Sequence, residues 1–305
     1  MSAFRPTRRG MRRRAGLLPA LLAGAVCLTA APGEGATPPP FRGGERLTYQ
    51  IRWLGMHVLT ARLEVEGPVD WKDAKALRYR LRLTSAGLLH PLYPIRDSAV
   101  SLADPETLAS RRLDVHQKEG FRYRSHKWMV FGKDHVLFGR GEREPVRHEA
   151  PEGVLDALSA LYKIRAQDLR PGAGTEIAVF DRKRTRLVRV QVTQAELLDS
   201  LWGPVRTLRV EPLFIGDEAL NRRGRAWIWV TADAARVPVR IESRTFVGSL
   251  VAHLVETRGL DGGPLAGPPV QEISAWRPAT RVVNESEWNP SEKLKELLNK
   301  KSQPR

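Results

Sequence analysis

The stretch LRYRLRLT, residues 77–84, alternates apolar and polar side chains without a break. Successive side chains of a β-strand point to opposite faces, so this period of two predicts a strand with one buried face and one solvated face. Residues 46–53 carry the same pattern, and residues 58–66 carry it again after Gly55. These two segments predict a hairpin that Gly67-Pro68 closes.

Rougher alternating segments continue along the chain, separated by short turns rich in Gly, Asp and Pro. The further predicted strands cover residues 95–103, 110–117, 122–131, 134–140, 175–181, 185–194, 204–213, 224–232, 236–246 and 249–257. Short strands at this spacing are typical of antiparallel barrels and sandwiches. Because roughly a dozen strands in one sheet must curl or close, we predict a mainly β chain with a curved antiparallel sheet or open barrel.

One segment, near residues 154–168, departs from the period of two. Its apolar residues recur at spacings of three and four, which predicts one helix inserted between the strands, with Pro171-Gly172 as its stop. Asp156 is placed to cap or start this helix. The structural interpretation is that the apolar side chains of the helix plug one end of the barrel.

A polar stripe follows along the same predicted helix, formed by Ser159, Tyr162 and Arg165 at three-residue steps. Such a stripe could bind the polar head of a ligand or hydrogen-bond to the barrel rim. In the structural alternative, Arg165 pairs with a strand carboxylate such as Asp97. Both interpretations make Arg165 important.

The N-terminal residues predict export. Six arginines within residues 1–14 precede an apolar run of about 17 residues, which then gives way to small and polar residues. We predict a cleaved signal peptide over residues 1–36, with an uncleaved N-terminal anchor as the alternative. The β domain then covers residues 42–260, and residues 261–305 form a Gly/Pro-rich linker and a basic C-terminal tail.

Composition sets further limits on the mature domain. Cys27 is the only cysteine and lies inside the predicted leader, so the mature chain has no disulfide and no thiolate site, and lipidation of Cys27 is disfavoured by Val26 before it. The full sequence has a formal net charge of +16 and stays basic without the leader, which favours anionic lipid or cell-wall surfaces over nucleic acid for an exported protein. We expect a periplasmic or envelope protein, with peripheral membrane association open.

The chain carries three motifs in order. They are Gly44-Glu45-x-Leu47-x-Tyr49-x-Ile51-x-Trp53-x-Gly55, then Asp156-x-Leu158-Ser159-Ala160-Leu161-Tyr162-x-Ile164-Arg165, then Asp233 with Arg236-Val237-Pro238-Val239-Arg240-Ile241 and Val247-Gly248-Ser249-Leu250. Together these motifs resemble those of DUF3108, a family of bacterial exported proteins of unknown function. The resemblance runs over about residues 42–257. It implies an envelope domain of curved antiparallel sheet, lipocalin-like or LolA-like in outline, with a helix packed against it, and it implies no particular chemistry.

The sequence offers no recognisable catalytic or metal motif. It has no G-x-S-x-G nucleophile elbow and no P-loop, and its seven histidines do not pair at metal-ligand spacing. A metal or carboxylate site built from distant strands stays open on sequence grounds. We therefore expect a protein that is not an enzyme, with no catalytic residues, no metal and no cofactor.

Aromatic side chains on shared strand faces supply the ligand hypothesis, because ligand pockets are lined mainly by such groups. The candidate ligand-binding residues are Tyr49, Trp53, Tyr162, Arg165, Trp227 and Trp229. We predict binding of an apolar or amphiphilic ligand, either a lipid or a lipid-linked glycan. The alternative is an envelope assembly scaffold without a pocket, whose basic tail, residues 293–305, docks a protein partner.

Overall fold

The computed structural model describes residues 26–27, 39–181, 183–217, 221, 224–245 and 248–260. The predicted leader, apart from the backbone of residues 26–27, and the predicted linker and tail at 261–305 lie outside the described residues. The predicted β domain, 42–260, is described apart from the short gaps within it.

Within the described residues, fifteen strands form one antiparallel sheet, accompanied by two helices. The first nine strands are β1 (Val26–Cys27), β2 (Arg46–Trp53), β3 (Met56–Trp71), β4 (Ala74–Ser85), β5 (Arg96–Ala103), β6 (Ser110–Glu119), β7 (Tyr123–Phe131), β8 (His135–Arg140) and β9 (Val146–Glu149). The others are β10 (Gly174–Asp181), β11 (Arg184–Ser200), β12 (Gly203–Phe214), β13 (Arg225–Thr231), β14 (Pro238–Thr245) and β15 (Gly248–Arg258). The helices are α1 (Leu89–Leu92) and α2 (Ala157–Arg165).

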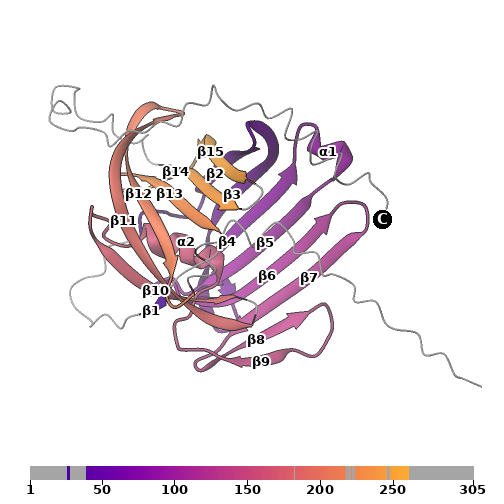
Figure 1. Ribbon diagram of the computed structural model, residues 1–305. Helices are drawn as coiled ribbons and strands as arrows, with labels where there is room; N and C mark the ends of the chain where they lie inside the picture. The colour runs from indigo at the N-terminus through magenta and orange to yellow at the C-terminus, as the bar shows by residue number, and fades with distance from the viewer. Residues whose placement is uncertain are drawn as a thin grey trace, which may run out of the picture.

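The sheet consists of two meanders joined side by side. Strands β2 to β9 pair in chain order, strands β10 to β15 do the same, and β15 pairs with β2. The two edge strands of the described sheet, β1 and β9, are not neighbours in it, so the sheet curls without closing (Figure 1). The prediction of a mainly β chain with a curved antiparallel sheet or open barrel is confirmed.

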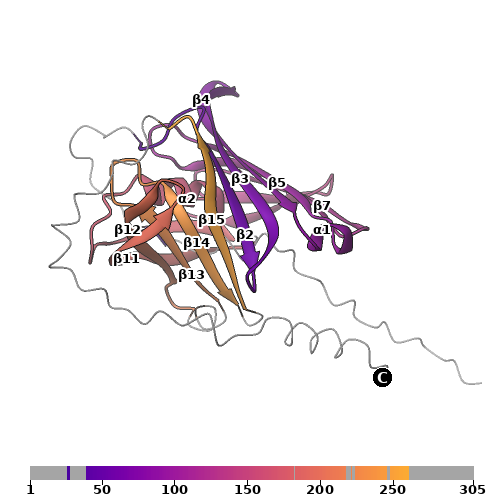
Figure 2. The same ribbon diagram turned by 90° about the horizontal axis from the view of Figure 1, so that it is seen from above.

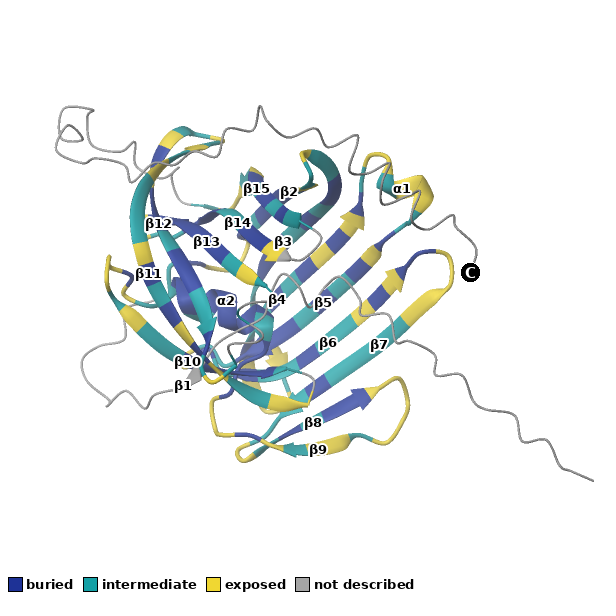
Figure 3. Cartoon of the chain, viewed as in Figure 1, coloured by how far each residue is buried: buried dark blue, intermediate teal, exposed yellow. Residues whose placement is uncertain are grey.

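The curl divides the sheet into two regions. Strands β10 to β15, together with β2 to β4, bend around α2, whereas β5 to β9 extend away as a flatter region that we call the wing (Figures 1 and 2). Buried residues gather around α2, while β7 and β9 of the wing remain largely half-buried or exposed (Figure 3). We call the face of the sheet that meets α2 the concave face.

The stretch at residues 77–84 behaves as its alternation predicts. Tyr79, Leu81 and Leu83 are buried in the core. The arginines between them lie on the opposite face and pair with carboxylates of β3, where Arg80 contacts Glu66 at 2.6 Å. Pairing of this kind explains how an arginine-rich strand face stays solvated without mutual repulsion.

Several element boundaries differ from those predicted. Gly67-Pro68 does not end β3, because a register shift between Glu66 and Pro68 absorbs Gly67 as a bulge and the strand continues to Trp71. Strand β11 likewise runs on to Ser200. The short elements α1 and β9 were not predicted, since four residues are too few to show a period.

Candidate functional site

Asp156 fixes the start of α2 to the sheet. Its Oδ1 accepts hydrogen bonds from the backbone N–H groups of Leu158 and Ser159, at 2.8 and 3.1 Å, which is a helix N-cap. Its Oδ2 accepts from the hydroxyls of Ser101 in β5 and Ser110 in β6, both at 2.6 Å. Every group in this network is buried, so the predicted cap is confirmed and also anchors the helix to two strands.

Arg165 fixes the other end of α2 through a partner that the sequence analysis did not identify. Its guanidinium donates to both carboxylate oxygens of Glu45, at 2.6 and 2.9 Å, and both side chains are 1% exposed. Further donor N–H groups reach the carbonyl oxygens of Ala235 and Arg236, each at 3.1 Å. This bidentate geometry satisfies a guanidinium that burial would otherwise destabilise.

The predicted pairing of Arg165 with Asp97 is therefore wrong. Strand β5, which carries Asp97, meets the start of α2 through Ser101 and Asp156. Arg165 lies at the other end of a nine-residue helix, roughly 13 Å away at 1.5 Å per residue. Asp97 instead accepts a hydrogen bond from the backbone N–H of Lys118 at 2.8 Å.

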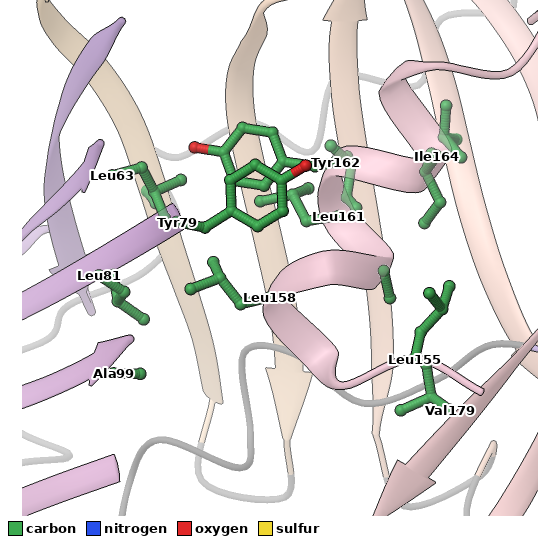
Figure 4. Packing of buried hydrophobic residues seen from close by; sticks show 14 of the residues in the cluster. Leu63, Tyr79, Leu81, Ala99, Leu155, Leu158, Leu161, Tyr162, Ile164 and Val179 are labelled. Carbon is green, nitrogen blue, oxygen red and sulfur yellow. The ribbon is translucent and has the colours of Figure 1, made fainter. Parts of the chain in front are cut away.

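Aromatic rings fill the space between α2 and the sheet. The rings of Tyr79 and Tyr162 stack with their centroids 4.1 Å apart, and Phe41 meets the ring of Tyr162 edge-on at 4.9 Å. Figure 4 shows Tyr79 reaching from β4 to lie against Tyr162 beside Leu161. Burial raises the pKa of both phenols, and the Tyr49 hydroxyl donates to the carbonyl of Pro238 at 2.8 Å. Tyr49, Tyr162 and Arg165 thus belong to one packed interior, in which the phenols are uncharged and the guanidinium is paired with Glu45.

Trp227 and Trp229 lie on the opposite face of the sheet. In the register of β13 and β14, Ile228 pairs with Ile241 of the concave face, whereas Trp229 pairs with Arg240 and Trp227 with Glu242. Since neighbouring residues of a strand point to opposite faces, the two tryptophans point away from α2. The guanidinium of Arg240 covers the Trp229 ring at 4.9 Å from the centroid.

The six predicted ligand-binding residues consequently do not share one site. Tyr162 and Arg165 lie on α2, Tyr49 lies on β2 in the same buried interior, and Trp53 is half-buried at the end of β2 on the same face as Tyr49. Trp227 and Trp229 lie across the sheet from them. An alternating pattern predicts which residues share a strand face, but it does not predict which face of a curled sheet becomes the inside.

A second polar group occurs on the concave face of the wing. Asp97, Gln117 and Glu119 are buried there, at 3%, 2% and 5% exposure. Asp97 shares its strand face with Ala99, and Gln117 shares its strand face with Val115. We call these three residues and Lys127 the wing cluster. The Gln117 Nε2 donates to Glu119 at 2.9 Å, and the ammonium of Lys127 donates to the Gln117 side-chain oxygen.

One carboxyl group of the wing cluster has a raised pKa. Burial raises the pKa of Asp97, although the Lys118 backbone N–H, the Gln117 and Glu119 side chains and the Lys127 charge act in the opposite direction. Two carboxyl groups, one amide and one ammonium therefore meet on a strand face that also carries the apolar side chains of Ala99, Leu113 and Val115. This arrangement can donate and accept hydrogen bonds to a polar group lying on the sheet.

The wing cluster was not predicted as a site. Asp97 was considered only as a possible partner of Arg165, and Glu119 lies just beyond the strand predicted at residues 110–117. The available signal was polar residues in the apolar phase of β5 and β6, since Asp97 continues the Ala99 face and Gln117 continues the Leu113 and Val115 face. Polar side chains in a buried phase demand partners, and this points to a site.

The other titratable side chains do not assemble into a metal centre. Within the described ranges, no three His, Cys, Asp or Glu side chains converge as a metal-ligand set would. His116 and His126 stack on the outer face at 4.2 Å between centroids, and His126 contacts Asp114 at 3.3 Å. Neither described helix has the length and hydropathy that crossing a bilayer requires.

Comparison with known proteins agrees with the sequence resemblance. The chain has 11% identity to a crystallised β-barrel-like protein of the DUF1849 family from Brucella abortus, covering 72% of this chain and 98% of the other with a TM-score of 0.48. It has 13% identity to a protein from Bacteroides fragilis with a YmcC-like fold, thought to be exported, covering 74% and 100% with a TM-score of 0.29. No curated protein sequence matches. The family of unknown function DUF3108 matches over residues 48–255, so the chain belongs to the DUF3108 family.

Proposed function

We propose that this chain is an exported envelope protein, without catalytic activity, that binds an apolar or amphiphilic ligand on the concave face of its wing. A lipid or a lipid-linked glycan has the required chemistry. The observation that carries the proposal is the wing cluster, a buried polar group that adjoins apolar side chains on the same sheet face. The basic n-region and apolar run of residues 1–36 support export.

The composition of the wing suits an amphiphile. Val115 is the register partner of Lys127, and Val115 and Phe131 are half-buried against the core. Val115 lies beside the Lys127 ammonium and two residues from the Gln117 amide, both of which can hydrogen-bond to a polar head, and Phe131 continues the Lys127 face further along β7. Ligand sites commonly combine an apolar lining with a few such polar groups.

The α2 region is less suited to binding. Its charged groups already have fixed protein partners, as Arg165 has Glu45 and Asp156 has Ser101 and Ser110. A ligand there would have to displace hydrogen bonds between buried groups, which costs free energy. The hydrogen bonds given above for the wing cluster come from the adjacent strands β6 and β7, and α2 is not packed over it (Figure 1).

The proposal is tested by native mass spectrometry, with lipid extraction, of the protein purified from the envelope of its own host. We expect a stoichiometric amphiphile on the wild-type protein and its loss from Lys127→Met. The matched control is Lys75→Met, which removes an exposed lysine paired with Asp70 at 2.6 Å on another part of the sheet. Bare protein mass in the wild type, or equal retention by Lys127→Met, would contradict the proposal.

A further inference from the structure

Two exposed segments meet at one end of the wing strands. The segment containing α1 joins β4 to β5, and the turn at residues 120–122 joins β6 to β7. The Gly120 backbone N–H donates to the carbonyl of Pro94 at 2.8 Å, and Ile95 bridges Glu119. Figure 3 shows both segments largely exposed, side by side at the same end of the sheet.

Large apolar side chains project from both segments. Leu88 is 77% exposed, Leu92 is 74% exposed and Phe121 is 72% exposed, with Tyr123 beside them at 37%. These are four of the nine large hydrophobic residues that are exposed among the described residues. Scattered exposed leucines are ordinary, but a cluster of them marks an interaction surface.

Four exposed cations accompany this apolar group. They are Arg96, Lys118, Arg122 and Arg124. Among the described residues, none of the four forms an ion pair, and the two carboxylates next to them in the chain, Asp97 and Glu119, are buried. We call the eight residues, Leu88, Leu92, Phe121, Tyr123 and the four cations, the tip.

The arrangement of the cations lowers the stability of the folded protein. Lys118 and Arg124 are direct register partners on β6 and β7. Like charges directly opposite one another destabilise a sheet. An anionic surface bound at the tip would remove this repulsion and gain Coulomb attraction.

The opposite ends of the same strands differ in charge. The β3–β4 turn carries Lys72 and Asp73, and the β7–β8 turn carries Lys133 and Asp134. Both signs are therefore mixed there, and Asp134 pairs with Arg147 at 2.9 Å. The single-sign charge of the tip is a local property and not a consequence of the basic composition.

We propose that the tip is a membrane-docking surface that binds a bilayer containing anionic phospholipid. Leu88, Leu92 and Phe121 enter the interfacial region, and the cations contact lipid phosphates. Aromatic and aliphatic side chains combined with basic residues are the combination that favours such interfacial binding. This inference does not depend on the ligand proposed for the wing, although it would hold the wing beside the membrane.

Vesicle co-sedimentation of the mature protein, purified from its host, tests the proposal. The vesicles contain phosphatidylcholine alone or phosphatidylcholine mixed with phosphatidylglycerol. We expect binding to the mixed vesicles that weakens with added salt, with the partition coefficient falling about fivefold for each cation removed in Arg96→Gln, Arg122→Gln and Arg124→Gln. The triple variant Leu88→Ser/Leu92→Ser/Phe121→Ser should lower it at least about tenfold.

Matched controls alter exposed residues away from the tip. Leu187→Ser/Leu197→Ser removes leucines that are 48% and 38% exposed, and Arg189→Gln removes an exposed arginine, so neither should change binding. Equal vesicle binding by tip and control variants would overturn the proposal, as would equal binding to both vesicle types. Tip-dependent dimerisation in sedimentation velocity, without vesicle binding, would assign the tip to a second copy of the chain instead.

Ligand retention and vesicle binding, measured on the same variants, distinguish this inference from the proposed ligand function. Tip variants should still carry the wing ligand in native mass spectrometry, while Lys127→Met should still bind anionic vesicles. Loss of vesicle binding in Lys127→Met and retention in every tip variant would contradict the tip as the docking surface.

Discussion

Two polar groups are buried on the concave face of the same sheet, and they differ in what satisfies them. Around α2, Arg165 and Asp156 are held by partners from distant parts of the chain, including Glu45, Ser101 and Ser110. In the wing, Gln117 bonds to Glu119 two residues away and to Lys127 on the next strand. Long-range partners lock a helix onto a sheet, whereas the partners within the wing cluster lie on adjacent strands and hold no helix in place.

This difference separates buried polar groups that stabilise the fold from buried polar groups that do not. The Arg165–Glu45 pair joins residues 120 positions apart in the chain, so it stabilises the closure of the curl around α2. The wing cluster closes no such distance and brings a carboxyl group into a region that raises its pKa. Groups that lower stability without organising the fold are candidates for function.

The largest expected effect is at the Arg165–Glu45 pair. Glu45→Gln leaves the buried guanidinium without a countercharge, so we expect the free energy of unfolding to fall by about 3–5 kcal/mol. Urea denaturation measures this change. The double variant Glu45→Leu/Arg165→Met should recover most of the loss, and an unchanged midpoint in Glu45→Gln would show that the pair does not stabilise the curl.

A smaller loss is expected at the cap of α2. Asp156→Ala removes the N-cap and leaves the hydroxyls of Ser101 and Ser110 without their acceptor, which should cost about 2–4 kcal/mol. Thermal unfolding checks the loss. In this variant, hydrogen exchange should show faster opening of α2 than of β7. Asp168→Ala, at an exposed carboxylate beyond the helix, serves as the control and should change stability little.

A substitution in the wing cluster should raise the free energy of unfolding instead of lowering it. Because burial raises the pKa of Asp97, the folded state favours the protonated carboxyl, and its contribution to stability is present in full below the unfolded pKa. That contribution is lost as pH rises through the folded pKa. Asp97→Asn should therefore gain stability over the wild type as pH rises above about 4, measured by urea denaturation across a pH series; a loss at neutral pH would assign Asp97 a structural role.

The smallest effect is expected from the stacked phenols. The hydroxyls of Tyr79 and Tyr162 are buried without a hydrogen-bond partner among the described residues. Tyr162→Phe retains the ring stack and removes an unsatisfied polar atom, so stability should stay the same or rise by about 1 kcal/mol. Tyr49→Phe provides the contrast, since it removes a hydrogen bond to Pro238 and should destabilise. A loss in Tyr162→Phe equal to that in Tyr49→Phe would show that the Tyr162 hydroxyl has a partner in solution.

The sequence was sufficient for the strands, because a period of two is a local property. Residues 46–53 form the strand predicted for them, and α2 lies within the predicted helical segment with Asp156 as its cap. The partner of Arg165 could not be predicted in this way, since Glu45 precedes a strand and reaches the helix only through the curl. The faces of Trp227 and Trp229 depended equally on which side of the sheet encloses α2.

The site in the wing was predictable only in part. Asp97, Gln117 and Glu119 occupy the apolar phase of their strands, and that anomaly is visible in the sequence. Their convergence depends on the register between β5 and β6, in which Ser98 pairs with His116. Register is set by cross-strand packing and turn geometry, and alternation alone does not specify which residues become neighbours.

The most direct test of the division between α2 and the wing is hydrogen exchange on the protein as purified from its host and on the same protein after lipid extraction. Extraction should speed exchange in β5, β6 and β7, and exchange in α2 should remain unchanged. Faster exchange in α2 with an unchanged wing would contradict the assignment of the wing as the ligand-binding surface.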